Sequence, residues 1–262
     1  MPVAETSRPA GSDSARRILD ILFSFTEDAP RRNVKELSKL LDIPVPSMHR
    51  YVALLRDMGV LADTTKGTYQ LTPRVLLLSR AASRANTILE AARPYLAGLA
   101  ADLDETVLLV QLIGSNPVCA DRYESSRLLR LSFQPGQSLP RLRGASVKVL
   151  LGSLPPAERE AYLRRAGASE HPPGSGADWE KELRLAGERG WAVSREEAEE
   201  GVWAAAAAIT ERNRVVGTVT VPCPAFRLTE SAQEEILEQV KKTAAHVSKE
   251  LEGRTFLYQP GG

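Results

Sequence analysis

The sequence has few of the residues that define several protein classes. Its 262 residues include two cysteines, Cys119 and Cys223, with no C-x-x-C pair and no histidine at a zinc-binding spacing. Neither a disulfide framework nor a metal site is therefore expected. No apolar run approaches the roughly eighteen residues of a membrane span, and the N-terminus lacks the layout of a secretory signal. We expect a cytoplasmic protein with no metal, no cofactor and no membrane partner.

The sequence also lacks an excess of basic charge. The net charge is +1, and residues 1–73 carry ten Lys or Arg against nine Asp or Glu. A nucleic-acid-binding domain usually carries a broad basic field. Any affinity for nucleic acid must therefore come from the placement of individual residues.

Signatures of catalysis are missing as well. Neither a P-loop nor G-x-G-x-x-G occurs, and none of His49, His171 and His246 has a Ser, Cys or carboxylate at a spacing that suggests a triad. His171 lies in a Pro/Gly-rich segment and His246 on a predicted helix near the C-terminus, where we expect both to be exposed. No catalytic residue and no enzyme activity are expected.

What the sequence does contain begins with two helical segments. After Ser14, apolar residues recur at helical spacing, at Ile18, Ile21, Leu22 and Phe25. Asn33 and Glu36 have the spacing of a capping box that opens a second helix. Its expected buried face is Leu37, Leu40 and Leu41.

A third helix begins around Pro46, whose missing N–H costs nothing in a first turn. One face carries apolar residues that would pack on the other helices, namely Met48, Val52 and Leu55. The opposite face is narrow and has short side chains, with Pro46, His49, Arg50 and Ala53. Such a face suits close approach to a rigid surface such as the DNA major groove. A solvated face that happens to hold one Arg and one His is the alternative.

After Gly59, two short strands are expected in "VLA" and "TYQL", joined by a loop that contains Lys66. Helix, helix, turn, helix and a two-stranded wing together predict a winged helix-turn-helix, with Lys66 near a phosphate. The residues expected to contact DNA are Val45, Pro46, Ser47, His49, Arg50 and Lys66.

The next helix, "PRVLLLSRAASRA", is too apolar to stand alone, and Val75, Leu76, Leu78 and Ala82 need a partner surface. The partner is either the same helix of a second subunit or another helix of this chain. A further helix with Ile88, Leu96 and Leu99 on one side follows, opened by a capping box of Thr87 and Glu90.

The pattern then changes to that of an α+β domain. Strands are expected in "TVLLVQLI", "PVCADRY" and "LLRLSF", then helices in "GASVKVLLGSL", in "PPAEREAYLRRA" and from Trp179 to Glu188. Strands in "GWAVS", "WAAAAAI" and "VVGTVTV" follow, and a long helix over residues 229–251 closes the domain.

The alanine-rich strand suggests a binding pocket, because side chains this small leave a hollow. Neighbouring threonines offer hydroxyl groups, a glycine at a helix start offers backbone N–H groups, and arginines offer counter-charges. The residues expected to bind an effector are Gly144, Ala145, Arg130, Arg143, Trp203, Ala206, Ala208, Thr218 and Thr220. A strand packed under a closely approaching helix is the alternative.

The segments "DIPVPSMHRYVALLRDMGV", "ERGWAVSREEAEEGVWAAAAAI" and "PAFRLT" resemble the IclR family of bacterial transcription regulators, and the resemblance runs from about Ser14 to Leu251. It implies a winged helix-turn-helix at 14–73, a linker helix at 74–86 and a GAF-like effector-binding domain at 87–252. Residues 1–13 and 253–262 are then flexible tails. The resemblance further implies dimers or dimers of dimers on partly palindromic operators.

Within this resemblance, Ser47, Met48, His49 and Arg50 match the family's recognition-helix pattern, which makes Arg50 the leading candidate for a DNA contact. The sequence departs from the family pattern at Leu142, Arg143 and Val147, and has Cys223 where the family has glycine. The departures at Leu142, Arg143 and Val147 suggest a larger or aromatic acid as effector. The expected function is effector-dependent control of a catabolic or metabolic operon; a winged-helix protein-interaction module and a GAF-like enzyme are the alternatives.

Overall fold

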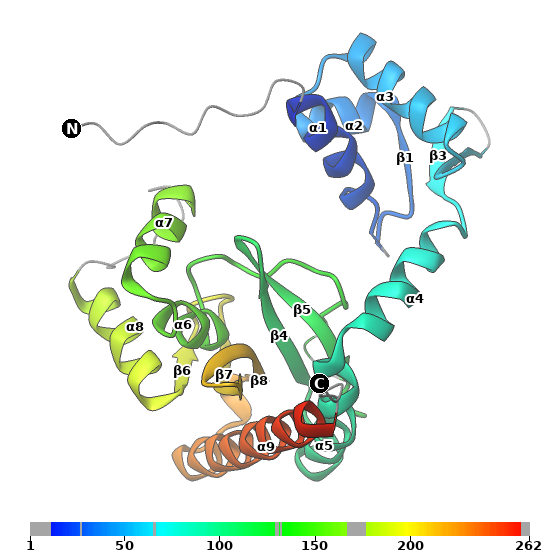
Figure 1. Cartoon of the computed structure of the whole chain (residues 1–262). Coiled ribbons are helices and arrows are strands. Elements are labelled where there is room, and N and C mark those ends of the chain that lie inside the picture. The colour runs from blue at the N-terminus through cyan, green and yellow to red at the C-terminus, as the bar shows by residue number, and fades with distance from the viewer. Residues whose placement is uncertain are drawn as a thin grey trace, which may run out of the picture. The chain divides into compact units, whose positions relative to one another are not determined.

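The computed structural model describes residues 12–257 except 27, 65–66, 129–130, 132 and 167–176. Lys66, Arg130 and His171 therefore lie outside the described residues, as do most residues of the two predicted tails. The chain divides into two compact units between Ala85 and Asn86 (Figure 1).

The first unit is mostly helical. In chain order it contains α1 (Ser12–Phe23), β1 (Arg31–Asn33), α2 (Val34–Leu41), α3 (Val45–Asp57), β2 (Leu61–Asp63), β3 (Thr68–Leu71) and α4 (Val75–Ala85). The predicted capping box is confirmed, because the Glu36 N–H donates to Asn33 Oδ1 at 2.9 Å and the Asn33 N–H donates to Glu36 Oε2 at 3.0 Å. The fully buried side chains of this unit include Ile21, Leu37, Met48 and Val52.

Three details of the first unit differ from the prediction. Leu40 is 55% exposed, because the buried stripe of the short helix α2 is only wide enough for Val34 and Leu37. The strand β1 was not predicted, since Arg31–Asn33 has no apolar alternation; it pairs with β3, so the wing belongs to a three-stranded antiparallel sheet of order β1-β3-β2. Finally, α1 begins at Ser12, inside the predicted tail.

The second unit has an α+β fold. In chain order it contains α5 (Thr87–Leu103), β4 (Val107–Ile113), β5 (Asn116–Tyr123), α6 (Ala145–Gly152), α7 (Pro156–Ala166), α8 (Ala177–Arg189), β6 (Trp191–Arg195), β7 (Val202–Glu211), β8 (Arg214–Pro224), the 3-10 turn η2 (Ala225–Arg227) and α9 (Glu230–Leu257). Its strands form an antiparallel sheet of order β5-β4-β8-β7-β6.

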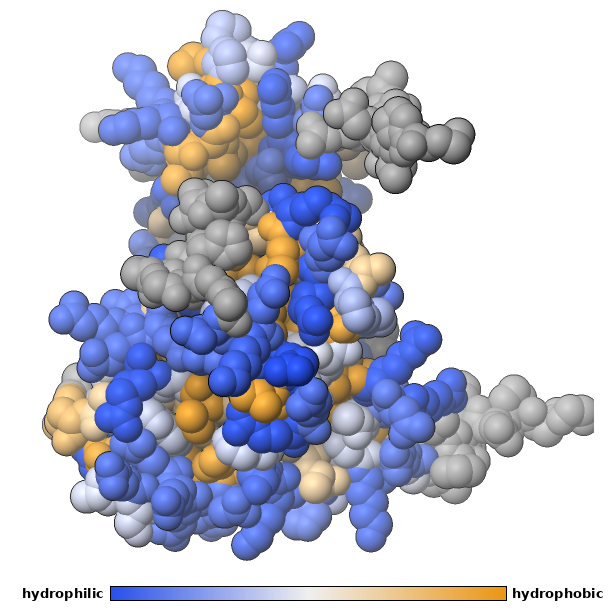
Figure 2. Space-filling view, turned by 90° about the vertical axis from the view of Figure 1, so that its left-hand side faces the viewer, coloured by the Kyte–Doolittle hydropathy of each residue, from blue (hydrophilic) through white to orange (hydrophobic). Residues whose placement is uncertain are grey.

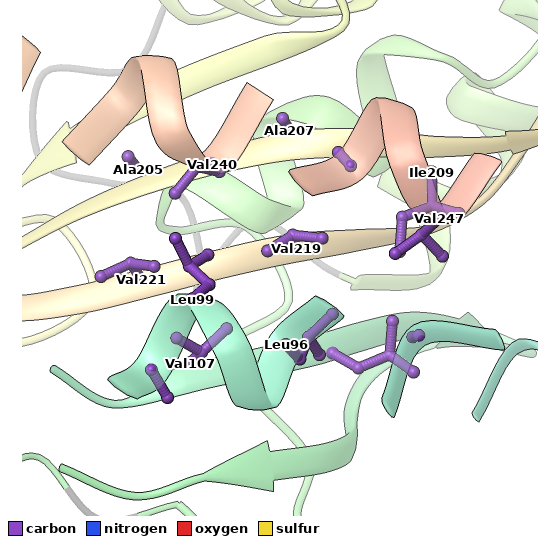
Figure 3. Packing of buried hydrophobic residues seen from close by; sticks show 14 of the residues in the cluster. Leu96, Leu99, Val107, Ala205, Ala207, Ile209, Val219, Val221, Val240 and Val247 are labelled. Carbon is purple, nitrogen blue, oxygen red and sulfur yellow. The ribbon is translucent and has the colours of Figure 1, made fainter. Parts of the chain in front are cut away.

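The sheet lies between two layers of helices. Helices α5 and α9 pack on one face, while α6 packs on the other and is itself covered by α8 (Figure 1). Because side chains alternate across a strand, every second residue of β7 points toward α5 and α9. Figure 3 shows this main core, with Ala205, Ala207, Ile209, Val219 and Val221 of the sheet among Leu96, Leu99, Val240 and Val247 of the helices.

Three predictions for the secondary structure and boundaries of the second unit are wrong. Leu131 and Phe133 of "LLRLSF" are not in a strand. The predicted capping box at Thr87 and Glu90 does not form; Glu90 instead pairs with Arg254, 3.4 Å away on α9. That helix continues to Leu257, so residues 253–257 are not part of a tail.

On the face shown in Figure 2, hydrophobic residues form patches separated by hydrophilic ones. Of the helices in the described ranges, none is both long and apolar enough to cross a membrane.

Candidate functional sites

Helix α3 has a buried face and an exposed face. Met48, Val52 and Leu55 are buried against the rest of the first unit. The other face is open to solvent and carries Val45, Pro46, His49, Arg50 and Ala53, with Ser47 half-buried at its edge. The structure therefore brings together all the described residues of the predicted DNA-contacting set on one side of one helix.

Arg50 has little to hold it on this face. Its Nη2 donates to Ser47 Oγ at 3.3 Å, one helical turn earlier, and no carboxylate pairs with it among the described residues. A guanidinium in this position keeps most of its donors available for an acceptor such as a guanine edge or a phosphate.

The wing is tied to the end of α3. Arg56 Nη2 lies 2.8 Å from Asp63 Oδ2 at the end of β2, and both side chains are about half exposed. An exposed ion pair of this kind adds little stability, about 0–1 kcal/mol. The pair does hold the end of β2 next to the last turn of α3.

Four of the predicted effector residues of β7 and β8, namely Ala206, Ala208, Thr218 and Thr220, line the sheet face that α6 covers. Ala206 lies opposite Thr220 and Ala208 opposite Thr218 in the β7–β8 register. Thr218 and Thr220 are buried, and Ser146 of α6 joins them through its hydroxyl. The Ser146 and Thr220 hydroxyl oxygens are 2.9 Å apart, and those of Thr218 and Thr220 are 3.1 Å apart. We call these three residues the hydroxyl row.

The space over the alanines is narrow. Ala206 is fully buried against Ala145 and Val149 of α6, whereas Ala208 is half-buried. At Ala206 the structure thus matches the alternative of a strand packed under a closely approaching helix. Two surface hollows, of about 430 and 280 Å³, lie outside this region, one between α7 and α8 and one between α7 and the β4–β5 turn.

The N-terminus of α6 borders the same region. Gly144 is its N-cap residue, with φ of 96° and no side-chain cap. A Cβ atom at Gly144 would lie 3.4 Å from the Ala198 Cβ, so the segment between β6 and β7 passes directly over this helix start. The first N–H groups of a helix have no intrahelical acceptor and are available to an anion. Arg143, the residue before Gly144, is half-buried.

Trp203 does not belong to this site, which corrects the prediction. It is buried in the main core with α5 and α9, because an odd-numbered residue of β7 points to the opposite face from Ala206 and Ala208. Because residues 204–208 are all alanine, the sequence shows no apolar–polar alternation that would assign a face to Trp203.

Two of the departures from the family pattern lie in a packed core. Leu142 and Val147 are buried with Tyr162 and Leu183, in a cluster formed by α6, α7 and α8. Helical spacing separates this side of α6 from the side that carries Ala145 and Val149. These two positions therefore contribute to a core behind α6.

Lys148 was missed by the sequence analysis. Its side chain is buried in the middle of α6, with Nζ 2.7 Å from Glu182 Oε2 of α8 and paired with Glu197, which precedes Ala198. The Lys148 ion pairs therefore hold the segment over the start of α6 in place. The available signal was a single lysine within the apolar stretch "ASVKVLLG".

The two cysteine thiols are unreactive at neutral pH. Burial raises the pKa of both Cys119 and Cys223 to about 12, helped by Asp121 and Glu105 respectively. The thiols are therefore protonated at neutral pH, and a neutral thiol is neither a good nucleophile nor a metal ligand.

Three helices with a wing, followed by a five-stranded antiparallel sheet between helical layers, define a winged-helix DNA-binding regulator with a separate GAF-like sensor domain. Two family models match in the same order: "IclR helix-turn-helix domain" over residues 14–64 and "Bacterial transcriptional regulator IclR C-terminal" over residues 80–249. The chain belongs to the IclR family of bacterial transcriptional regulators. It is a transcriptional regulator with an N-terminal DNA-binding domain and a C-terminal effector-binding domain.

Relatives align over most of their length. The HTH-type transcriptional regulator KipR of Bacillus subtilis is 28% identical over 226 residues, covering 85% of this chain and 90% of KipR. The HTH-type transcriptional repressor AllR of Escherichia coli is 26% identical over 253 residues, covering 95% of this chain and 93% of AllR. Their names describe regulators, which implies a role other than catalysis.

Solved structures share the fold. An IclR transcriptional regulator from Alicyclobacillus acidocaldarius superposes with a TM-score of 0.75 at 21% identity, covering 91% of this chain and 98% of its own. An IclR homologue from Microbacterium hydrocarbonoxydans, complexed with 4-hydroxybenzoate, gives 0.74 at 19% identity, covering 92% and 99%.

Proposed function

We propose that a small organic or aromatic acid binds between α6 and the β7–β8 face of the sheet and thereby controls how α3 engages operator DNA. In this proposal residues 14–73 form the DNA-binding domain, 74–86 the linker helix and 87–252 the effector-binding domain. The regulated genes form a catabolic or metabolic operon, and the protein works in the cytoplasm, where operator DNA is found.

The hydroxyl row is the observation that carries the effector site. Three hydroxyl groups have three hydrogens to donate, and the two hydrogen bonds within the row use two of them. The third suits an oxygen acceptor such as a carboxylate, and the N–H groups after Gly144 suit the same charge. Ala208, which is half-buried, leaves the most room for an apolar ligand body. The 4-hydroxybenzoate held by a protein of the same fold fits this class.

On the DNA side, we propose that Arg50 contacts a base edge in the major groove, with His49, Ser47, Pro46 and Val45 beside it. Lys66 is proposed as a phosphate contact of the wing. Both roles agree with a chain of net charge +1, because they need well-placed cations and not a basic field.

The effector site is tested by filling it. A panel of organic and aromatic acids, including 4-hydroxybenzoate, is first screened for a change in operator affinity of the wild-type protein. Ala208→Phe should then abolish that change and leave operator binding without the acid intact, because the two units have separate cores. Ala101→Phe adds the same volume at an exposed position of α5 and serves as the control. A folded Ala208→Phe protein with an unchanged acid response would place the pocket elsewhere.

We also propose that α4 pairs with α4 of a second copy, giving a homodimer or a dimer of dimers. Leu76, Leu77 and Leu78 are 54%, 66% and 71% exposed in the single chain, and consecutive exposed leucines on a helix favour a protein partner. Leu78→Asp should shift sedimentation toward the monomer. Leu40→Asp, a change at another exposed leucine of the first unit, should not. Equal sedimentation of Leu78→Asp and wild type would rule out this surface.

A further inference from the structure

The recognition helix α3 ends in a tight Schellman motif. Gly59 adopts φ of 68°, its N–H donates to the Arg56 carbonyl at 2.8 Å, and the Val60 N–H donates to the Leu55 carbonyl at 2.9 Å. These bonds turn the chain sharply away from the helix axis. The carbonyls of Met58, Gly59 and Val60 then lie beyond the helix and need donors from elsewhere.

Two residues just before α4 supply all three donors. Arg74 Nη1 donates to the Met58 carbonyl at 2.7 Å, and Thr72 Oγ1 donates to the Gly59 carbonyl at 2.6 Å. The Thr72 N–H donates to the Val60 carbonyl at 2.9 Å. We call these three hydrogen bonds the α3–α4 clamp. The Arg74 charge adds to it, because the C-terminal end of a helix carries partial negative charge.

Gly59 is needed for the Schellman motif, because its φ of 68° is strained for a residue with a side chain. An added Cβ would lie at an ordinary contact distance of 3.5 Å from Arg74 Nη1, so Arg74 passes close to this turn. Arg74 is followed directly by Val75, the first residue of α4. The end of α3 and the start of α4 are therefore fixed to each other through two side chains and one backbone N–H.

We propose that Thr72 and Arg74 are positioning residues for operator recognition, which hold the exposed face of α3 in the orientation set by the start of the linker helix. A change in the direction of α4 must either carry the end of α3 with it or break the clamp. The proposal rests on DNA binding by the first unit and is independent of where an effector binds.

The cleanest test changes Thr72, because it leaves the charge of the protein unaltered. Thr72→Val keeps the shape and removes the hydroxyl, which both donates and accepts a hydrogen bond, while Thr72→Ser keeps it. The probes are a duplex selected from random DNA by the wild-type protein and an unrelated duplex of the same length. Thr72→Val loses the hydrogen bond to the Gly59 carbonyl at 2.6 Å and the one that Thr72 Oγ1 accepts from the Arg74 N–H at 3.3 Å. These losses should lower affinity for the selected duplex about 5- to 10-fold. Affinity for the unrelated duplex should not change, and Thr72→Ser should match the wild type within about twofold.

Arg74→Met separates positioning from a direct phosphate contact. Loss of a phosphate contact lowers the slope of log affinity against log salt by about one and weakens both duplexes alike. Loss of the clamp should leave the salt slope unchanged and weaken only the selected duplex. A reduced slope with parallel losses would therefore overturn the role of Arg74.

A purely structural role is distinguished by hydrogen exchange. The positioning role predicts faster exchange at Gly59 and Val60 in Thr72→Val, with unchanged protection of the buried amides of α2. If protection falls throughout the first unit, or if Thr72→Val binds the selected duplex as tightly as the wild type, the proposal is wrong.

Discussion

The two units place their functional residues in opposite surroundings. The side chains proposed to contact DNA lie on the exposed face of α3 and take no part in the core of the first unit. In the second unit, the residues proposed to bind an effector come from α6, β7 and β8 and are themselves packed between layers. A substitution on the exposed face of α3 should therefore change binding alone, whereas a substitution around α6 changes folding and binding together.

The contact between α6 and α8 gives the largest expected effect. A Cβ atom at Gly187 of α8 would lie 2.2 Å from the Gly152 carbonyl oxygen of α6. No rotamer can avoid this contact, because the backbone fixes the position of the Cβ and the oxygen belongs to the backbone of α6. Gly187→Ala should destabilise the second unit by about 3 kcal/mol, the upper end for overpacking. Urea unfolding monitored in both units measures this effect.

The matched control for that change is Gly98→Ala. Gly98 lies within α5 and its added Cβ would meet open space. Alanine is the better helix former there, so stability should rise by about 0.5–1 kcal/mol. If Gly187→Ala and Gly98→Ala had the same effect, the close approach of α6 and α8 would not be real. The first unit should keep its unfolding midpoint in both variants.

Arg50→Ala should change DNA binding and leave stability unaltered, the reverse of Gly187→Ala. Removing an arginine from a base edge should weaken operator binding by about 1–3 kcal/mol and relax sequence preference at one position. Thermal unfolding should be unchanged, because Arg50 is exposed. Arg184→Ala, which removes the same charge from an exposed position of α8, is the control for electrostatics. Equal operator affinities of Arg50→Ala and wild type would remove Arg50 from the interface.

Lys148→Met should lower the free energy of unfolding of the second unit, by less than Gly187→Ala does. The substitution keeps the length of the buried stem but leaves Glu182 and Glu197 without their ammonium partner. Because both carboxylates reach solvent, we expect a loss of about 1–2 kcal/mol, below the range for a fully buried pair. The acid response should weaken too, since the segment before Ala198 is no longer held over α6. Unchanged unfolding would show that the ion pairs contribute nothing net.

The difference between the exposed helix face of the first unit and the packed site of the second also explains how much of the fold and of the sites could be predicted from the sequence. The exposed and buried faces of α3 follow from helical spacing, and the capping box at Asn33 depends on two residues three apart. These are local patterns. The role of Lys148 depends on Glu182 and Glu197, which lie far along the chain and reach it only through packing.

Two further wrong predictions also depend on contacts between segments that are distant in the sequence. Trp203 was assigned to the pocket because five consecutive alanines give no period from which to choose a face of β7. The strand β1 exists only because β3 pairs with it, and three polar residues carry no strand signal of their own. The fold class was predictable from the order of elements, whereas the composition of the buried site was not.

The smallest expected effect concerns pH and the end of α5. Asp104, in the left-handed conformation with φ of 48°, accepts hydrogen bonds from Ser126 Oγ at 2.8 Å and from the Ser126 N–H at 3.0 Å. These bonds, with the nearby Arg127, lower the pKa of the Asp104 carboxyl below its ordinary value of 3.8. A carboxyl with a lowered folded-state pKa stabilises the fold at pH values above its ordinary pKa, and this contribution is lost as the pH falls through the folded-state value.

Asp104→Asn should therefore lower the melting temperature of the second unit slightly at pH 6, and the difference from wild type should shrink at pH 3. Asparagine tolerates the left-handed conformation, so the backbone of this turn is preserved. Asp102→Asn removes the same charge from an exposed position two residues earlier and should show no such pH-dependent difference. About 43% of the Asp104 side chain is exposed, so added salt should reduce the effect through screening. A difference that stays constant from pH 6 to pH 3 would mean that the amide change, and not the carboxylate charge, is responsible.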